Sequence, residues 1–187
     1  MSLTAAEEME LLTLLEAEEK HQASTNYYAY VKHTHGRMYS YTRHGEFICN
    51  ILNEAVEKRR QMLAGSIPTQ TQYYMFSVPP QHGKSMHITE TFPSFFLGNF
   101  PTEGVIEISY NETFAEKFGS KNRDKINLYG KELFNIQISK DTNAKGEWEV
   151  TQDGKKTRGG MISRGIMSGV TGSSLCLLYT SPSPRDS

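Results

Sequence analysis

The chain has 187 residues, of which 37% are hydrophobic and 22% are charged, and its formal net charge is −1. These values are typical of a globular protein with one core of moderate size, and they exclude a largely disordered chain. No apolar run approaches the ~20 residues of a membrane span, and the acidic first residues lack the basic start of a signal peptide. The two cysteines form no disulfide framework, so we expect an intracellular, reducing location.

The charge is unevenly distributed along the chain. Residues 1–20 contain six Glu and one Lys, a net charge of −5, so the remaining residues carry +4. This basic excess is too small to indicate nucleic-acid binding by itself. The spacing of Met9, Leu12 and Leu15 predicts an amphipathic helix from Glu7 to Lys20. Its charges are most simply a solvated face, and a helix that docks on a partner is the alternative.

Two further segments are expected to form a helical part of the core. The aromatic cluster at Tyr27, Tyr28 and Tyr30 is more typical of a core than of a platform for stacking nucleic-acid bases. A helix is predicted from about Thr42 to Leu63, and Gly65 is expected to end it. The residues expected on its inward side are Phe47, Ile48, Ile51, Leu52, Ala55 and Val56.

A Gly-Lys-Ser tripeptide lies between a predicted strand and a predicted helix. The β-forming residues of Tyr73–Val78 predict a short buried strand, and residues 86–90 can be helical. Strand, loop, Gly83-Lys84-Ser85 and helix follow one another in the order that is typical of a phosphate-binding loop.

The residue types suit such a loop. Backbone N–H groups and the helix dipole would face a phosphate, Lys84 would reach the β- and γ-phosphates, and the Ser85 hydroxyl would bind Mg²⁺. The usual pattern opens with a glycine at the position that Val78 occupies here. A solvated loop that leads into a helix therefore remains the alternative.

A second strand is predicted at residues 104–109, after a short helix that begins near Pro93 and ends at Gly98. Two strands joined by a crossover helix at this spacing indicate a parallel, right-handed unit. We therefore expect the segments 73–78 and 104–109 to belong to one parallel sheet.

The next helix is expected to begin at Ser109 or Asn111, both good N-caps, and to run to Tyr129. It should bury Phe114, Phe118 and Ile126. Its other side carries four basic residues, Lys117, Lys121, Arg123 and Lys125. They are candidates for an exposed DNA-binding face, and an ordinary solvated helix face is the alternative.

The last part of the chain is rich in β-forming and turn residues rather than helix-forming ones. The turn signal Asp153-Gly154, with β-forming residues at 148–150 and 161–163 on either side, predicts a β-hairpin. A glycine-rich run follows at residues 165–172. Residues 176–186 resemble a translated transposase-type sequencing adapter, so we leave this tail out of the expected fold and expect the chain to be a fragment. A Ser/Pro-rich disordered terminus is the alternative.

Two segments carry a resemblance to a known family. Pro79–Ser85 resembles a Pro-Pro-x-His-Gly-Lys-Ser loop, and Ser109-Tyr110-Asn111 resembles the end of a second strand, both found in the large terminase subunits of tailed bacteriophages. Further similarities lie at residues 44–49, 92–101, 114–119, 123–124 and 159–172. The resemblance covers roughly residues 24–172, and the family usually lacks the glycine that Val78 replaces.

The resemblance implies a motor ATPase that uses ATP and Mg²⁺ to move double-stranded viral DNA into a preformed shell. The implied fold is α/β: a partial P-loop NTPase core of the ASCE/RecA-like class with a parallel sheet, preceded by an α-helical N-terminal segment. The implied partners are viral DNA, a portal protein and a small terminase subunit. The complete protein would form a homo-oligomeric ring in the host cytoplasm, without a membrane.

The same resemblance assigns residues to the nucleotide. The phosphates would be held by Pro80, Gln81, His82, Gly83, Lys84 and Ser85, and Ser85 would also hold Mg²⁺. His44 is a candidate adenine contact, with an ordinary core or surface histidine as the alternative. We expect four parts: an acidic helix at 1–22, a helical subdomain at 23–66, an incomplete ATPase core at 67–175, and a non-native tail at 176–187.

The chain departs from the family in one respect. The family's next element is an apolar strand that ends in paired acids, the Walker B motif, and no such strand follows Ser109. We therefore expect this chain to lack the catalytic acids and to be inactive as an ATPase. The alternatives are another P-loop protein, such as a DNA-repair or helicase-like ATPase or a kinase-like phosphotransferase, and an inert fragment.

Overall fold

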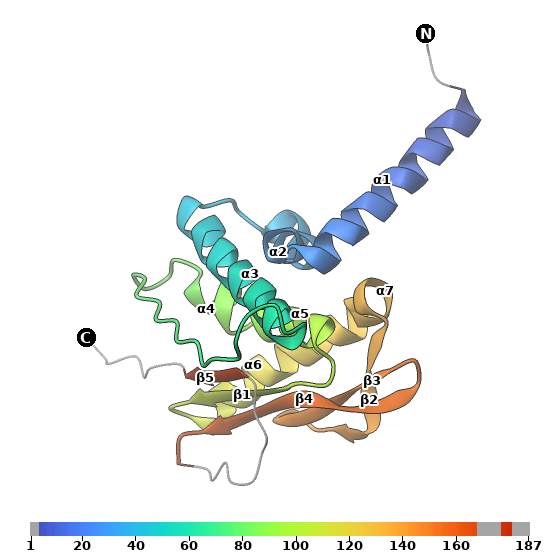
Figure 1. The fold of residues 1–187 in the computed structure, drawn as a ribbon. Coiled ribbons are helices and arrows are strands. Elements are labelled where there is room, and N and C mark those ends of the chain that lie inside the picture. The colour runs from blue at the N-terminus through green and yellow to red at the C-terminus, as the bar shows by residue number, and fades with distance from the viewer. Residues whose placement is uncertain (1–3, 168–176, 181–187) are drawn as a thin grey trace.

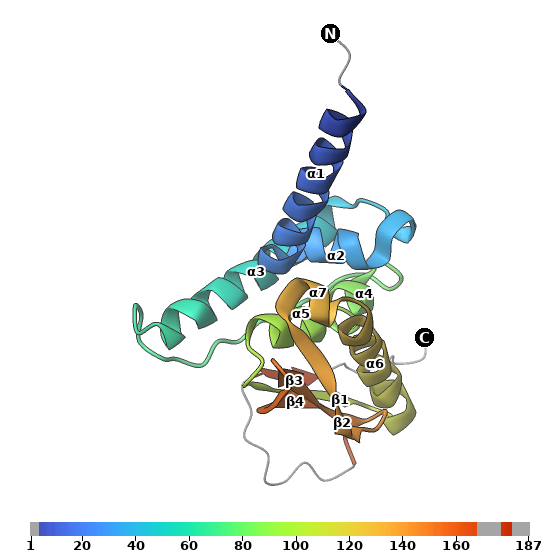
Figure 2. The same cartoon turned by 90° about the vertical axis from the view of Figure 1, so that its right-hand side faces the viewer.

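The computed structural model describes residues 4–167 and 177–180. Helices α2 to α6 lie over one face of a twisted sheet, and the N-terminal helix α1 projects away from this body (Figure 1). A view turned by 90° shows the same two layers and the same projecting helix (Figure 2). The chain is therefore a mixed α/β fold with a helical N-terminal part, as the sequence predicts at this coarse level.

The helical part begins with three α-helices whose starts are set by local capping. They are α1 (Ala5–Thr25), α2 (Tyr27–His35) and α3 (Arg43–Leu63), with the short 3₁₀-helix η1 (Gly36–Met38) between the last two. Thr4, Asn26 and Thr42 each accept a hydrogen bond from a backbone N–H of the helix that follows. The predicted helices over 7–20 and 42–63 are thus confirmed, and Gly65 follows the end of α3 with a positive φ of 71°.

Further helices connect the candidate loop to the sheet. They are α4 (Lys84–Ile88), α5 (Phe92–Asn99), α6 (Glu112–Lys125), the π-helix η2 (Ile126–Gly130) and α7 (Lys131–Phe134). Pro93 lies in the first turn of α5, where its missing N–H costs no hydrogen bond. The N-cap of α6 is Asn111, one of the two predicted candidates, because its side chain accepts a hydrogen bond from Thr113 N–H at 2.8 Å.

The sheet is mixed, whereas a parallel sheet was expected. Its strands are β1 (Gly104–Ser109), β2 (Ile136–Asn143), β3 (Glu147–Gln152), β4 (Lys155–Gly165) and β5 (Leu177–Thr180), in the order β2-β3-β4-β1-β5. β1 pairs in parallel with β4 and β5, while β2, β3 and β4 pair antiparallel. The predicted hairpin is confirmed: Asp153 and Gly154 both have positive φ, as a two-residue type I′ turn between β3 and β4 requires.

The predicted strand at Tyr73–Val78 is wrong, and so is the parallel unit built on it. The segment is irregular, and Tyr73 and Met75 are 90% and 96% exposed. It does not pair with β1, its expected neighbour in the sheet, because both edges of β1 are paired, with β4 on one side and β5 on the other. Only Phe76 and Val78 of this segment pack partly against the core.

The segment that we left out of the fold contributes the edge strand β5. Residues 177–180 pair in parallel with Val105–Ile108 of β1. Tyr and Thr are enriched in strands, and without this segment β1 would have an open edge here. The glycine-rich run is described only as far as residue 167, so the rest of that prediction lies outside the described residues.

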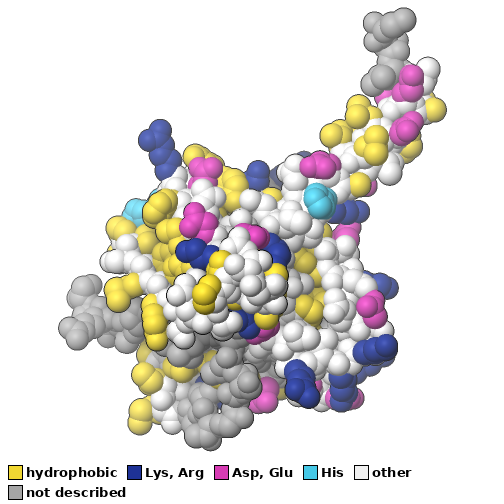
Figure 3. Space-filling view, viewed as in Figure 1, with side chains coloured by type: hydrophobic (Ala, Val, Ile, Leu, Met, Phe, Trp, Pro, Cys, Tyr) yellow, Lys and Arg dark blue, Asp and Glu magenta, His cyan; other side chains and the backbone are white. Residues whose placement is uncertain are grey.

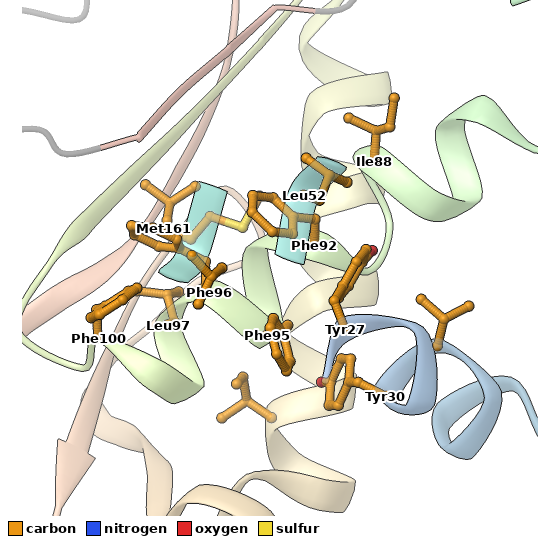
Figure 4. Close-up of a cluster of buried hydrophobic side chains, with 14 of the residues drawn as sticks. Tyr27, Tyr30, Leu52, Ile88, Phe92, Phe95, Phe96, Leu97, Phe100 and Met161 are labelled. Atoms are coloured by element: carbon orange, nitrogen blue, oxygen red, sulfur yellow. The ribbon is translucent and has the colours of Figure 1, made fainter. Parts of the chain in front are cut away.

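One hydrophobic core contains residues of both the helical part and the sheet, on either side of the expected boundary at residue 66. Tyr27 and Tyr30 are fully buried, which confirms the core interpretation of the aromatic cluster. Their rings lie 5.1 and 5.3 Å from the ring of Phe95 in α5 (Figure 4). On the sheet side, buried Trp148 of β3 donates its Nε1–H to the carbonyl of Gly119 in α6 at 3.1 Å.

Several residues expected to face inward are exposed. Phe47 is 65% exposed because it lies on the side of α3 that faces the irregular 73–78 segment. Phe114 is 44% exposed and stacks on Tyr110 at the start of α6, beyond the end of β1.

Figure 3 shows hydrophobic and acidic side chains together along the projecting α1. The exposed apolar residues of α1 are Met9, Leu11, Leu12, Leu14 and Leu15.

Candidate functional site

The candidate phosphate loop leads directly into α4. Gly83 is the N-cap of this helix and has a left-handed backbone, with φ 73° and ψ 8°. Gln81 also has a positive φ, 62°. The loop therefore turns twice within three residues, and only the second turn is at a glycine, the residue for which this conformation is free of steric cost. The backbone reversal places Lys84 and Ser85 in the first turn of α4.

Backbone donors are free at the junction of loop and helix. Within the described residues, the N–H groups of Gly83, Lys84, Ser85 and Met86 make no hydrogen bond. Lys84 is half-buried and forms no ion pair with a described residue, and Ser85 is exposed. A helix start always leaves N–H groups free, but here they occur together with an unpaired lysine and an exposed hydroxyl. This set of donors could hold an anion such as a phosphate.

The first half of the loop is held by histidines. His44 of α3 donates its Nε2–H to the carbonyl of His82 at 2.8 Å, and the two rings lie 5.5 Å apart. His82 is exposed and its Nδ1 donates to the carbonyl of Pro80 at 2.7 Å. Pro80 and Gln81 are exposed. The structure thus places His44 beside the loop, with its Nε2–H bonded to a loop carbonyl, and its predicted contact with adenine stays a prediction.

A groove of about 510 Å³ runs beside this loop. One wall is α3, with His44, Phe47 and Ile51, and the other is the irregular segment from Tyr73 to Pro79. Its walls are mostly apolar and aromatic, which suits a flat ring such as a nucleobase. A larger cavity of about 630 Å³ lies between η2, α7 and β2, and none of the candidate residues lines it.

The four basic residues of α6 do not form one exposed face, so that expectation is wrong in part. Lys121 pairs with Glu90 at 2.6 Å, and Lys125 Nζ donates to the Glu90 backbone carbonyl at 2.9 Å. Burial lowers the pKa of Lys125. Arg123 is half-buried and lies 3.9 Å from Asp124, and only Lys117 is exposed. The cause is Glu90, which follows α4 and draws two of the four cations towards the core.

A buried acid, which was not among the predicted site residues, lies in the inner strand β1. Glu107 in β1 has no solvent exposure, and neither of its carboxyl oxygens has a hydrogen-bond partner among the described residues. Burial, with a smaller contribution from the negative charge of Glu90, raises the pKa of Glu107 to about 9. The signal in the sequence is a single Glu inside the otherwise apolar run Val105–Ile108 of the predicted strand.

The described residues hold no group of three or more His, Cys, Asp or Glu that could bind a metal ion. No helix in the described part of the chain is long and apolar enough to cross a membrane. No family model, curated protein or solved structure matches the chain. The candidate site therefore rests on the residues of the loop and on their geometry.

Proposed function

We propose that the chain binds the phosphates of ATP at the loop Pro80–Ser85. The observation that carries the proposal is a set of four N–H groups, from Gly83 to Met86, that have no partner among the described residues, together with Lys84, which forms no ion pair there. Amide donors and a lysine together compensate the negative charge of a triphosphate better than either does alone. In this proposal Lys84 reaches the β- and γ-phosphates, and the groove beside His44 receives the adenine.

A magnesium ion would be held mainly by the nucleotide. Ser85 offers one exposed hydroxyl, and no cluster of acids accompanies it among the described residues. Mg²⁺ commonly keeps several waters and binds through one or two protein groups and the substrate phosphates. When bound, it would neutralise charge on the phosphate oxygens, and the task of Ser85 would be to orient it.

At the level of the whole protein, we propose the nucleotide-binding part of a viral DNA-packaging motor, a terminase large subunit with a P-loop NTPase core. The support is the resemblance of Pro79–Ser85 and of Ser109–Asn111 to that family. β5, which pairs in parallel with β1, lies along the chain about where the family's Walker B strand is expected, although no acid pair follows it. Double-stranded DNA, a portal protein and a small subunit are the partners of this proposal.

The test is a titration of the chain with a fluorescent ATP analogue in the presence of Mg²⁺. Lys84→Ala should abolish binding, because the removed ammonium is the only side-chain cation that the loop itself supplies. Lys58→Ala is a matched control, since Lys58 is exposed on α3 and forms no ion pair with a described residue. Equal affinity in the wild type and in Lys84→Ala would reject the phosphate-binding assignment.

A further inference from the structure

We propose that His87 is the positioning residue of the candidate phosphate loop, and that its neutral imidazole ties the carbonyl of Gly83 to the hydroxyl of Tyr39. The inference deepens the proposed function, because it names the residue that holds the loop in its anion-binding shape. His87 lies in α4, three residues after Lys84, and it is 2% exposed. It is a residue type whose ring can bond on two sides at once.

The two ring nitrogens of His87 have different partners. Nδ1 lies 2.8 Å from the carbonyl oxygen of Gly83, which can only accept, so Nδ1 carries the proton. Nε2 lies 3.2 Å from the hydroxyl oxygen of Tyr39 and accepts its hydrogen bond when the ring is neutral. Burial lowers the pKa of His87, which favours this neutral form. The network therefore selects a single tautomer.

The carbonyl of Gly83 receives two hydrogen bonds from the same residue. The second comes from the backbone N–H of His87, at 3.1 Å. The carbonyl of His87 in turn accepts a hydrogen bond from the hydroxyl of buried Tyr27 in α2. A continuous set of contacts thus runs from the loop through His87 to α2 and to Tyr39, which precedes α3.

Close packing leaves the ring no room to move. A Cβ atom added at Gly45 of α3 would lie 2.8 Å from both Cε1 and Nε2 of His87. One added at Gly83 would lie 3.3 Å from Cε1, and the ring of Tyr39 meets the His87 ring edge to face at 5.8 Å. The backbone of α3 and that of the loop therefore enclose the imidazole from two sides.

This arrangement bears on phosphate binding because of where Gly83 lies. The left-handed φ of Gly83 sets the direction of its own N–H and of the N–H groups that follow. A carbonyl fixed by two hydrogen bonds holds this peptide plane before any ligand arrives, so less ordering is needed on binding. His87 acts through the backbone of the loop and touches no phosphate itself.

The test compares two substitutions of similar size. His87→Asn keeps a side-chain N–H near the position of Nδ1, whereas His87→Leu keeps apolar volume but has no donor. The amides of Thr89 and Glu90 report on the loop, because both donate to the carbonyl of Ser85, at 2.9 and 2.8 Å, and we call their hydrogen exchange the loop exchange. We expect His87→Leu to speed loop exchange and to weaken binding of the fluorescent ATP analogue, each roughly tenfold, the effect of one lost hydrogen bond. His87→Asn should stay close to the wild type in both measurements.

A second measurement begins with the wild-type protein, so its first result does not depend on how any variant folds. Nitrogen-15 NMR of the wild-type imidazole should show a neutral ring with the proton on Nδ1. Tyr39→Phe, which removes only the hydroxyl, should shift the Nε2 resonance and leave Nδ1 protonated. A proton on Nε2, or loop exchange that is the same in His87→Leu as in the wild type, would overturn the inference.

The outcomes separate this inference from the proposed function. If wild-type protein binds no nucleotide, but loop exchange rises in His87→Leu and not in His87→Asn, the proposed function fails and the role of His87 stands. If nucleotide binds and Lys84→Ala abolishes it, but His87→Asn loosens the loop as much as His87→Leu does, the proposed function stands and His87 is only a buried packing residue.

Discussion

Glu107 of β1 and Ser163 of β4 lie opposite each other in the parallel pair, and both side chains are fully buried. The Ser163 hydroxyl acts to lower the pKa of Glu107, against the larger effect of burial, but no hydrogen bond of normal geometry to either side chain is present among the described residues. A Cβ atom added at Gly119 of α6 would lie 2.5 Å from the hydroxyl of Ser163. The backbone of α6 therefore packs directly against the Ser163 side chain. A carboxyl group enclosed in this way stays protonated at neutral pH, because ionising it would leave an uncompensated buried charge.

The first prediction follows from the raised pKa of Glu107. Below pH 4.5 the group is protonated in both the folded and the unfolded chain; between pH 4.5 and about 9 only the unfolded chain releases the proton. The contribution of Glu107 to stability is therefore fully present below pH 4.5 and is lost as the pH rises towards 9. Glu107→Gln should not show this loss. At the alkaline end of the range its free energy of unfolding should therefore exceed that of the wild type by several kcal/mol more than at acid pH.

The measurement is the free energy of unfolding by denaturant across this pH range. The advantage of Glu107→Gln over the wild type should grow as the pH rises, because the amide has no proton to lose. Glu54→Gln on the exposed surface of α3 is the control and should show no such trend. A pH-independent difference for Glu107→Gln would mean that the carboxyl is ionised in the folded protein.

The second prediction concerns DNA and the basic residues of α6. If DNA passes over α6, Lys117→Gln should reduce the salt dependence of DNA binding by about one counterion, because Lys117 is exposed. Lys125→Gln should leave the slope unchanged, since its ammonium is bonded to the carbonyl of Glu90. Binding constants at several salt concentrations measure the slope. The same slope in Lys117→Gln and in the wild type would remove α6 from the DNA interface.

The third prediction is that this chain does not turn over ATP, even with the loop intact. Phosphoryl transfer needs an acid that holds Mg²⁺ from the side opposite Ser85, and a group that orients the attacking water. No acid pair ends β1, and Glu107 is buried and protonated at neutral pH. Phosphate release should stay at background with and without DNA. Turnover at ~1 s⁻¹ that disappears in Lys84→Ala would show that a catalytic acid has been overlooked.

The fourth prediction separates core residues from the projecting helix. Phe95→Ala should destabilise the fold by about 3–5 kcal/mol, because the ring is fully buried between Tyr27, Tyr30 and Phe134. Leu12→Ala should change the free energy of unfolding by no more than about 0.5 kcal/mol, since Leu12 is 56% exposed on α1. Thermal or denaturant unfolding of both variants checks this. A large loss in Leu12→Ala would show that α1 packs against another surface in solution.

Local sequence was enough for the features that a few neighbouring residues determine. Thr42 and Asn111 cap their helices with their own side chains, and Asp153-Gly154 forms its turn through backbone preferences. The Gly-Lys-Ser spacing likewise predicts a loop that leads into a helix, which is what residues 83–88 form. Each of these depends on residues at most a few positions apart, so periodicity, capping and turn rules apply directly.

Only the tertiary structure decided which segments pair and which side chains are enclosed. Tyr73–Val78 has the composition of a strand, but both edges of its expected neighbour, β1, are taken by β4 and β5, segments that follow it in the chain. Phe47 and Ile48 are neighbours in one helix, yet one faces a groove and the other the core. The contact of His87 with Tyr39 and the burial of Glu107 join residues far apart in the chain, and such contacts form only when helices and sheet pack.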